Sequence, residues 1–137
     1  MPVNYNTISS NSVISTGSGA SNHGIYLLNN ANKNYVDNNS VNSSGTTTNY
    51  GIILTGSTDN IVNKNIIFTK GITTMNSDAL FISGSSVNNF ITNNIVLSAF
   101  GNALQFSFAT NSPDGNTVKN NSFSKSSAAL VKRRLNN

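Results

Sequence analysis

The chain has 137 residues, which suits one domain, and it is weakly charged: 9% of residues are charged and the formal net charge is +4. The absence of cysteine excludes a disulfide framework and a thiolate metal site, and the regularly placed Ile and Val residues exclude disorder. Part of the positive charge lies in Lys132, Arg133 and Arg134, which we interpret as a solvated tail rather than a nucleic-acid contact. No apolar stretch approaches the ~20 residues needed to span a bilayer.

Pairs of asparagines, separated by five positions within each pair, recur along the chain. The pairs are Asn6/Asn11, Asn34/Asn39, Asn60/Asn65, Asn89/Asn94 and Asn116/Asn121. A polar pair repeated in constant relation to its apolar neighbours indicates a stack of equivalent structural turns. In chain order, we therefore expect one repeat domain over 1–137, with coils near 4–23, 24–50, 51–78, 79–102 and 103–128. Residues 127–137 are expected to form either a tail or a C-terminal cap.

Two short strands are predicted in each coil around the asparagine pair. Two residues after the first Asn stand Ile8, Val36, Val62, Ile91 and Val118. Two residues after the second Asn stand Val13, Val41, Ile67, Val96 and Phe123. A spacing of two places each Asn and its aliphatic neighbour on one face of a strand, and the two residues between them predict a bend.

A third strand is predicted where a small residue is followed by alternating apolar positions. These segments begin at Gly24, Gly51, Ala79 and Ala103, and a weaker fifth copy begins at Ala129. Three short strands and three bends per repeat fit a coil that climbs ~4.8 Å per turn and builds three parallel sheets. We therefore predict an all-β, single-stranded, right-handed parallel β-helix of about five coils.

The inward asparagines require a structural explanation, because a buried unpaired amide costs ~1–3 kcal/mol. When they are stacked, each amide donates to the carbonyl of the Asn in the next coil, and the column satisfies itself as a ladder. Aspartate lacks the donor, so only the amide fits. We assign this structural role to all ten paired asparagines.

The Asn-x-[Ile/Val]-x-x-Asn-x-[Val/Ile/Phe] units resemble the right-handed parallel β-helix proteins of the pectin-lyase-like superfamily, and specifically NosD-like Asn-rich repeats. The resemblance covers almost the whole chain. It implies an extended carbohydrate as the usual class of ligand, bound along one sheet. It also implies a stack with more coils, so the chain is expected to be a fragment or a minimal version. A secreted or cell-surface location is expected, although no signal peptide is visible near Met1.

Catalysis is the weaker functional hypothesis. The four acids, Asp37, Asp59, Asp78 and Asp114, fall in different columns, so no convergent carboxylate pair is predicted. One column before the Gly/Ala corner holds His23, Tyr50 and Asp78, the candidate residues for acid–base chemistry in a polysaccharide lyase, epimerase or hydrolase module. We expect no catalytic centre, no metal site and no cofactor.

Carbohydrate binding or a structural role is the favoured hypothesis. The outward positions of the third strand are Tyr26, Ile53, Phe81 and Gln105, where aromatic side chains can stack on sugar rings. Further outward apolar residues follow the other two strands and are expected under loops or subunits. Uncapped ends of such a stack expose strand edges, so a homo-oligomer or a self-assembling fibre subunit is the third alternative.

Overall fold

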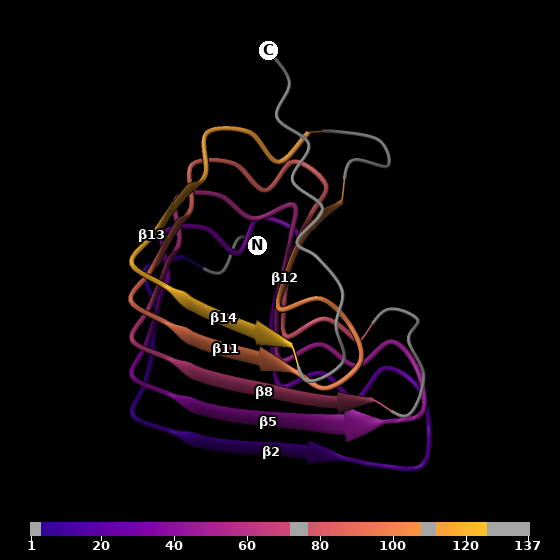
Figure 1. Cartoon of the computed structure of the whole chain (residues 1–137). Helices are drawn as coiled ribbons and strands as arrows, with labels where there is room; N and C mark the ends of the chain where they lie inside the picture. Colours follow the sequence, from indigo (N-terminus) through magenta and orange to yellow (C-terminus); the bar gives the residue numbers. More distant parts are fainter. Residues whose placement is uncertain (1–3, 72–76, 108–111, 126–137) are drawn as a thin grey trace.

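The structure is a computed structural model that describes residues 4–71, 77–107 and 112–125. Every strand in this part of the chain pairs in parallel with the equivalent strand of the neighbouring coil (Figure 1). The predicted parallel β-helix with an internal asparagine ladder is confirmed. The weak third-strand copy at Ala129 and the predicted tail or cap at 127–137 lie outside the described residues.

Three sheets run along the stack. The first sheet contains β1 (Thr7–Ser9), β4 (Tyr35–Asp37), β7 (Ile61–Asn63), β10 (Phe90–Thr92) and β13 (Thr117–Lys119). The second contains β2 (Ser12–Thr16), β5 (Ser40–Gly45), β8 (Ile66–Gly71), β11 (Ile95–Ser98) and β14 (Ser122–Lys125), seen as stacked arrows in Figure 1. The third contains β3 (Ile25–Leu28), β6 (Ile52–Thr55), β9 (Leu80–Ser83) and β12 (Leu104–Ser107).

The core lies between the sheets and is built from the predicted inward columns. Val36, Val62 and Ile91 of the first sheet are fully buried, as are Ile52 and Leu80 of the third. The registers place these residues directly above one another, so each aliphatic side chain packs against its equivalents in the adjacent coils. Burial of this kind stabilises the fold by ~1.5–3 kcal/mol for each fully buried side chain, before the entropy of ordering the chain is subtracted.

Each asparagine of the ladder follows a residue with left-handed backbone geometry. At the first bend these residues are Tyr5, Lys33, Asp59, Asn88 and Gly115, and at the second they are Ser10, Asn38, Lys64, Asn93 and Asn120. A left-handed residue costs a non-glycine side chain ~1–2 kcal/mol, so the surrounding structure must hold it in place. The single left-handed residue turns the chain from one sheet into the next, and the amide that follows it points inward.

The amides form two continuous ladders. Asn65 lies in the middle of the second ladder, where its Nδ2 donates to Asn94 Oδ1 at 3.0 Å and its Oδ1 accepts from Asn39 Nδ2 at 3.0 Å. The Asn65 side chain also donates to the Val36 carbonyl at 2.8 Å. Every polar atom of this fully buried side chain therefore has a partner, which is the condition for burying an amide without a large free-energy cost.

Candidate binding faces and the polar corner

The corner before the third sheet brings His23, Tyr50 and Asp78 into one column. The backbone N–H of Gly24 donates to the Tyr50 carbonyl at 3.0 Å, and that of Gly51 donates to the Asp78 carbonyl at 3.4 Å. The rings of His23 and Tyr50 stack with centroids 5.2 Å apart. Phe81 covers the opposite face of Tyr50, at 4.4 Å, so the three rings form a continuous stack.

These groups are arranged for packing rather than for proton transfer. Nδ1 of His23 accepts the backbone N–H of Tyr50 at 3.3 Å. Burial lowers the pKa of His23 from its ordinary value of 6.5, so the ring is neutral at pH 7. Burial, reinforced by the negative charge of Asp78, raises the pKa of Tyr50 to about 12. No hydrogen bond among the described residues joins two of these three side chains.

Asp78 is a buried acid in this corner. Its Oδ1 accepts the backbone N–H of Asn102 at 2.6 Å, whereas its Oδ2 is buried without a partner. Burial raises the pKa of Asp78, although the hydrogen bonds from Asn102 and the charge of Lys125 act in the opposite direction. The Asp78 carboxylate is therefore held away from solvent.

A third, short ladder stands next to this column and was missed in the sequence. The backbone N–H of Asn22 donates to Asn49 Oδ1 at 3.1 Å. In the next coil the equivalent position is Ser77, whose side chain is too short to continue the ladder. Asn49 Nδ2 and Ser77 Oγ are both buried without a partner. The signal available was the recurrence of Asn one residue before His23 and one residue before Tyr50.

The predicted third-strand row is interrupted. Tyr26, Ile53, Phe81 and Gln105 do share one register on the outer side of the third sheet. Tyr26 is 44% exposed, but Ile53 is only 4% exposed. The Phe81 ring lies against Tyr50, and Gln105 Oε1 accepts from Asn102 Nδ2 at 3.0 Å. Three of the four side chains are thus covered or engaged by their own chain.

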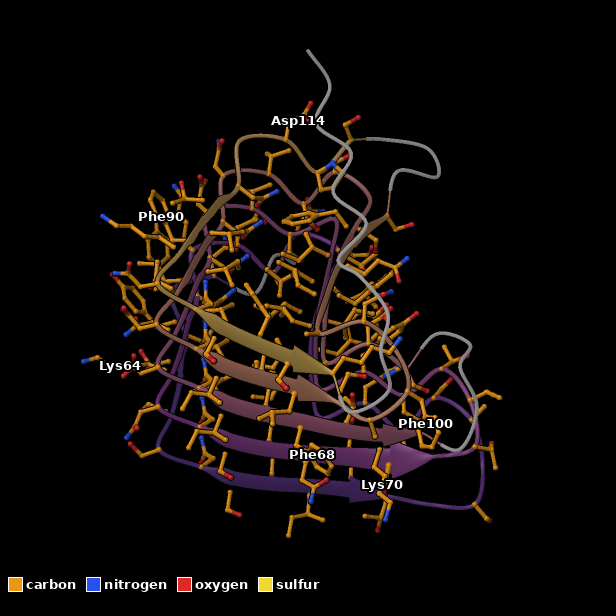
Figure 2. The ribbon with its side chains drawn as sticks, viewed as in Figure 1. Lys64, Phe68, Lys70, Phe90, Phe100 and Asp114 are labelled. Carbon is orange, nitrogen blue, oxygen red and sulfur yellow. The ribbon has the colours of Figure 1, made fainter. Side chains whose placement is uncertain are left out.

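The first sheet presents a more open outer face. Its strands align one row containing Tyr35, Ile61 and Phe90, and a second row containing Asp37, Asn63 and Thr92. Tyr35 is 50% exposed and Phe90 is 49% exposed. Figure 2 shows Phe90 and Lys64 projecting from this side, whereas Phe68 and Lys70 project from the second sheet.

A shallow groove runs between the two rows. It has a volume of about 430 Å³ and is lined by Thr7, Ser9, Tyr35, Asp37, Ile61 and Asn63. The polar row is a surface ladder, in which Asn63 Nδ2 donates to Asp37 Oδ1 at 2.6 Å and Thr92 Oγ1 donates to Asn63 Oδ1 at 2.9 Å. Apolar rings beside fixed hydrogen-bonding groups can hold a flat ligand with polar edges.

The stacked coils, the internal ladders and the open outer sheet define the class of parallel β-solenoids. The family model described as "Periplasmic copper-binding protein (NosD)" matches residues 1–137, and the chain belongs to this family. The periplasmic character of the family agrees with the predicted secreted or surface location. No helix in the described part of the chain is long and apolar enough to cross a membrane. No curated protein and no solved structure matches the chain.

The described residues do not fit a copper centre. Copper in proteins is held by thiolates, thioethers and imidazoles. The whole sequence has one histidine, two methionines and no cysteine, and the methionines, Met1 and Met75, lie outside the described ranges. Nowhere in 4–71, 77–107 and 112–125 do three His, Cys, Asp or Glu side chains gather. His23 already accepts a backbone hydrogen bond through Nδ1.

Proposed function

We propose that this chain is a periplasmic β-helix repeat domain that binds an extended carbohydrate along the outer face of its first sheet. The observation that carries the proposal is the groove, which is lined by Tyr35 and Ile61 on one side and by Asp37 and Asn63 on the other. The strand register continues these two rows to Phe90 and Thr92 in the next coil. Both rows repeat once per coil. A polymer of similar units laid along the stack would meet the same pair of contacts in successive coils.

The chemistry of the two rows suits sugar rings. Exposed aromatic faces attract the C–H faces of a sugar through burial of apolar surface, and the amide and hydroxyl groups meet its hydroxyls. The first sheet is preferred to the third-strand row because Ile53 is buried and Phe81 is covered by Tyr50 on one face. Tyr26 alone does not make a continuous surface.

The test is a binding screen against neutral and uronic-acid polysaccharides, followed by titration calorimetry on the best ligand. We expect Tyr35→Ala to weaken binding about tenfold, which corresponds to ~1.4 kcal/mol, and Phe90→Ala to have a similar effect on a ligand long enough to reach it. Ile66→Ala is the matched control, because Ile66 is 51% exposed but lies on the second sheet. Tyr26→Ala tests the third-strand row.

Two outcomes would contradict the proposal. The first is a screen with no binding above background for any polysaccharide. The second is a loss of affinity in Ile66→Ala equal to that in Tyr35→Ala, which would indicate general destabilisation. If Tyr26→Ala weakens binding and Tyr35→Ala does not, the ligand lies on the third sheet instead.

A further inference from the structure

We propose that copies of this chain associate head to tail, with the first coil of one copy docked on the fifth coil of the next. This proposal concerns the ends of the stack and is independent of the glycan-binding face. It rests on the direction of the asparagine ladders and on the state of the core columns at the two ends.

The ladders are directional. In each rung the backbone N–H and the side-chain Nδ2 of one Asn donate to Oδ1 of the Asn in the following coil. This holds for Asn6 to Asn34 at 2.9 and 3.0 Å, and for Asn89 to Asn116 at 2.8 and 2.9 Å. The second ladder runs the same way from Asn11 to Asn39, and it ends with Asn94 donating to Asn121. The two ends of the stack are therefore chemically different.

The first coil ends in acceptors and the fifth coil ends in donors. Within the described residues no donor reaches Oδ1 of Asn6 or Asn11, and both side chains are exposed. At the other end, Nδ2 of Asn116 and of Asn121 donates to carbonyls of its own chain, but the described residues contain no following rung for their backbone N–H groups. A second copy placed above the fifth coil would supply the missing Oδ1 atoms at the spacing of an ordinary rung.

Among the described residues, nothing continues the core columns beyond the first and fifth coils. In the column that contains Val36, Val62 and Ile91, the middle residues are fully buried, whereas Val118 is 38% exposed and Ile8 is partly exposed. The second-sheet column likewise ends in partly exposed Val13 and Phe123. Docking would bury these side chains against equivalents of their own column, as each internal coil does.

The occupant that fits is another copy of this chain in the same orientation. Its first coil carries the same two asparagine columns and the same apolar columns as the coil it would replace. Two first coils facing each other would oppose Oδ1 acceptors, and two fifth coils would oppose N–H donors, so neither symmetric pairing satisfies the ladder. A head-to-tail contact does not close on itself when the axis is straight, so it extends into a rod.

Sedimentation velocity over a concentration series tests the proposal, together with a head variant, Ile8→Asp, and a tail variant, Val118→Asp. The wild-type chain is expected to show a sedimentation coefficient that rises with concentration. Each variant alone should sediment as a monomer, with no dimer present, because an aspartate desolvated in the interface would be unpaired. An equimolar mixture of the two should form a heterodimer, since one intact head and one intact tail remain.

The matched control is Ile66→Asp, which changes a similarly apolar and exposed residue on the side of the stack and should leave assembly intact. The folded state of each variant is checked by its β-sheet circular dichroism. If an Asp variant unfolds, a folded domain fused to the N-terminus blocks the head without changing the core. A wild-type chain that stays monomeric at all concentrations overturns the proposal. Dimers of either single variant, or loss of assembly in Ile66→Asp, would do the same.

Discussion

At the scale of single residues, the molecule depends on where side-chain amides and acids lie relative to the next coil. The two long ladders bury six of their ten asparagines with partners in adjacent coils, namely Asn34, Asn39, Asn60, Asn65, Asn89 and Asn94. The corner ladder, in contrast, stops after Asn49. Two buried polar atoms are left without partners where it stops, Asn49 Nδ2 and Ser77 Oγ, and Asp78 Oδ2 beside them is also unpartnered. Each such atom costs ~1–3 kcal/mol of stability, so this corner is the place where substitutions can stabilise the fold.

Extending the corner ladder tests that idea. We expect Ser77→Asn to raise the free energy of unfolding by about 1–2 kcal/mol, because the new Oδ1 would accept the unpaired Nδ2 hydrogen of Asn49. Urea denaturation followed by circular dichroism measures the change. Ser77→Ala is the control, since it removes the unpaired hydroxyl without adding an acceptor. An equal gain in both variants would show that the ladder bond is not the cause.

The buried acid predicts a pH dependence of stability. Because the pKa of Asp78 is raised in the folded state, the fold binds this proton more tightly than the unfolded chain does. The stabilisation that protonated Asp78 gives to the fold is therefore fully present below the unfolded pKa of about 3.8, and it is lost as the pH rises through the folded pKa.

Asp78→Asn should remove this dependence while keeping the Oδ1 acceptor for Asn102. We expect the variant to have a higher melting temperature than the wild type at pH 7, and the difference to shrink as the pH falls toward 4. Thermal melts across this range measure it. A variant that is less stable than the wild type at pH 7 would show that the ionised carboxylate stabilises the folded state.

At the scale of elements, the corner that starts the third sheet is governed by the close approach of neighbouring coils. A Cβ added to Gly51 would contact Ile67 Cγ2 and the Ala79 carbonyl oxygen. Gly24 has the same surroundings, facing Val41 and the Gly51 carbonyl. The small residue predicted at this corner is therefore required by the next coil rather than by an unusual backbone angle.

Gly51→Ala is expected to destabilise the fold by about 1–3 kcal/mol, because the fully buried Ile67 and the backbone of the third sheet must shift to admit the methyl group. The midpoint of urea unfolding measures the loss. Gly19→Ala is the matched control, since nothing lies within 4 Å of its added Cβ. Equal stability of both variants would indicate that the corner relaxes without cost.

At the scale of the whole molecule, stability should be distributed unevenly along the stack. Internal coils have neighbours on both sides, whereas the first and fifth coils have one each among the described residues. In a solenoid the stability of each repeat depends on its nearest neighbours, so the ends open more readily than the middle.

Amide hydrogen exchange tests this distribution. Under conditions where the chain is monomeric, we expect the amides of Val62 and Ile67 to exchange at least about tenfold more slowly than those of Ile8 and Val118. Uniform protection along the stack would show that it opens as a single unit. If the head-to-tail contact forms, raising the concentration should slow exchange at the two ends selectively.

The sequence by itself determined the architecture, because a two-residue alternation of Asn and aliphatic residues, repeated once per coil, is compatible with few folds. It also identified both long ladders and the aliphatic columns of the three sheets, but not the short column of Asn22 and Asn49. It did not reveal the left-handed residues before each ladder Asn, because those positions hold Tyr5, Lys33 and Asp59 as readily as Gly115. Their conformation is imposed by the adjacent coils rather than by their own preferences.

Only the tertiary structure decided which outer face is open. Ile53 and Tyr35 both read as outward residues in the sequence, yet the first is buried and the second is half exposed. Alternation along a strand specifies the side of a sheet on which a side chain lies. It does not specify whether a neighbouring corner, such as the stack of His23, Tyr50 and Phe81, covers that side. Coverage depends on rings brought together from different coils, so it arises only when the coils are stacked.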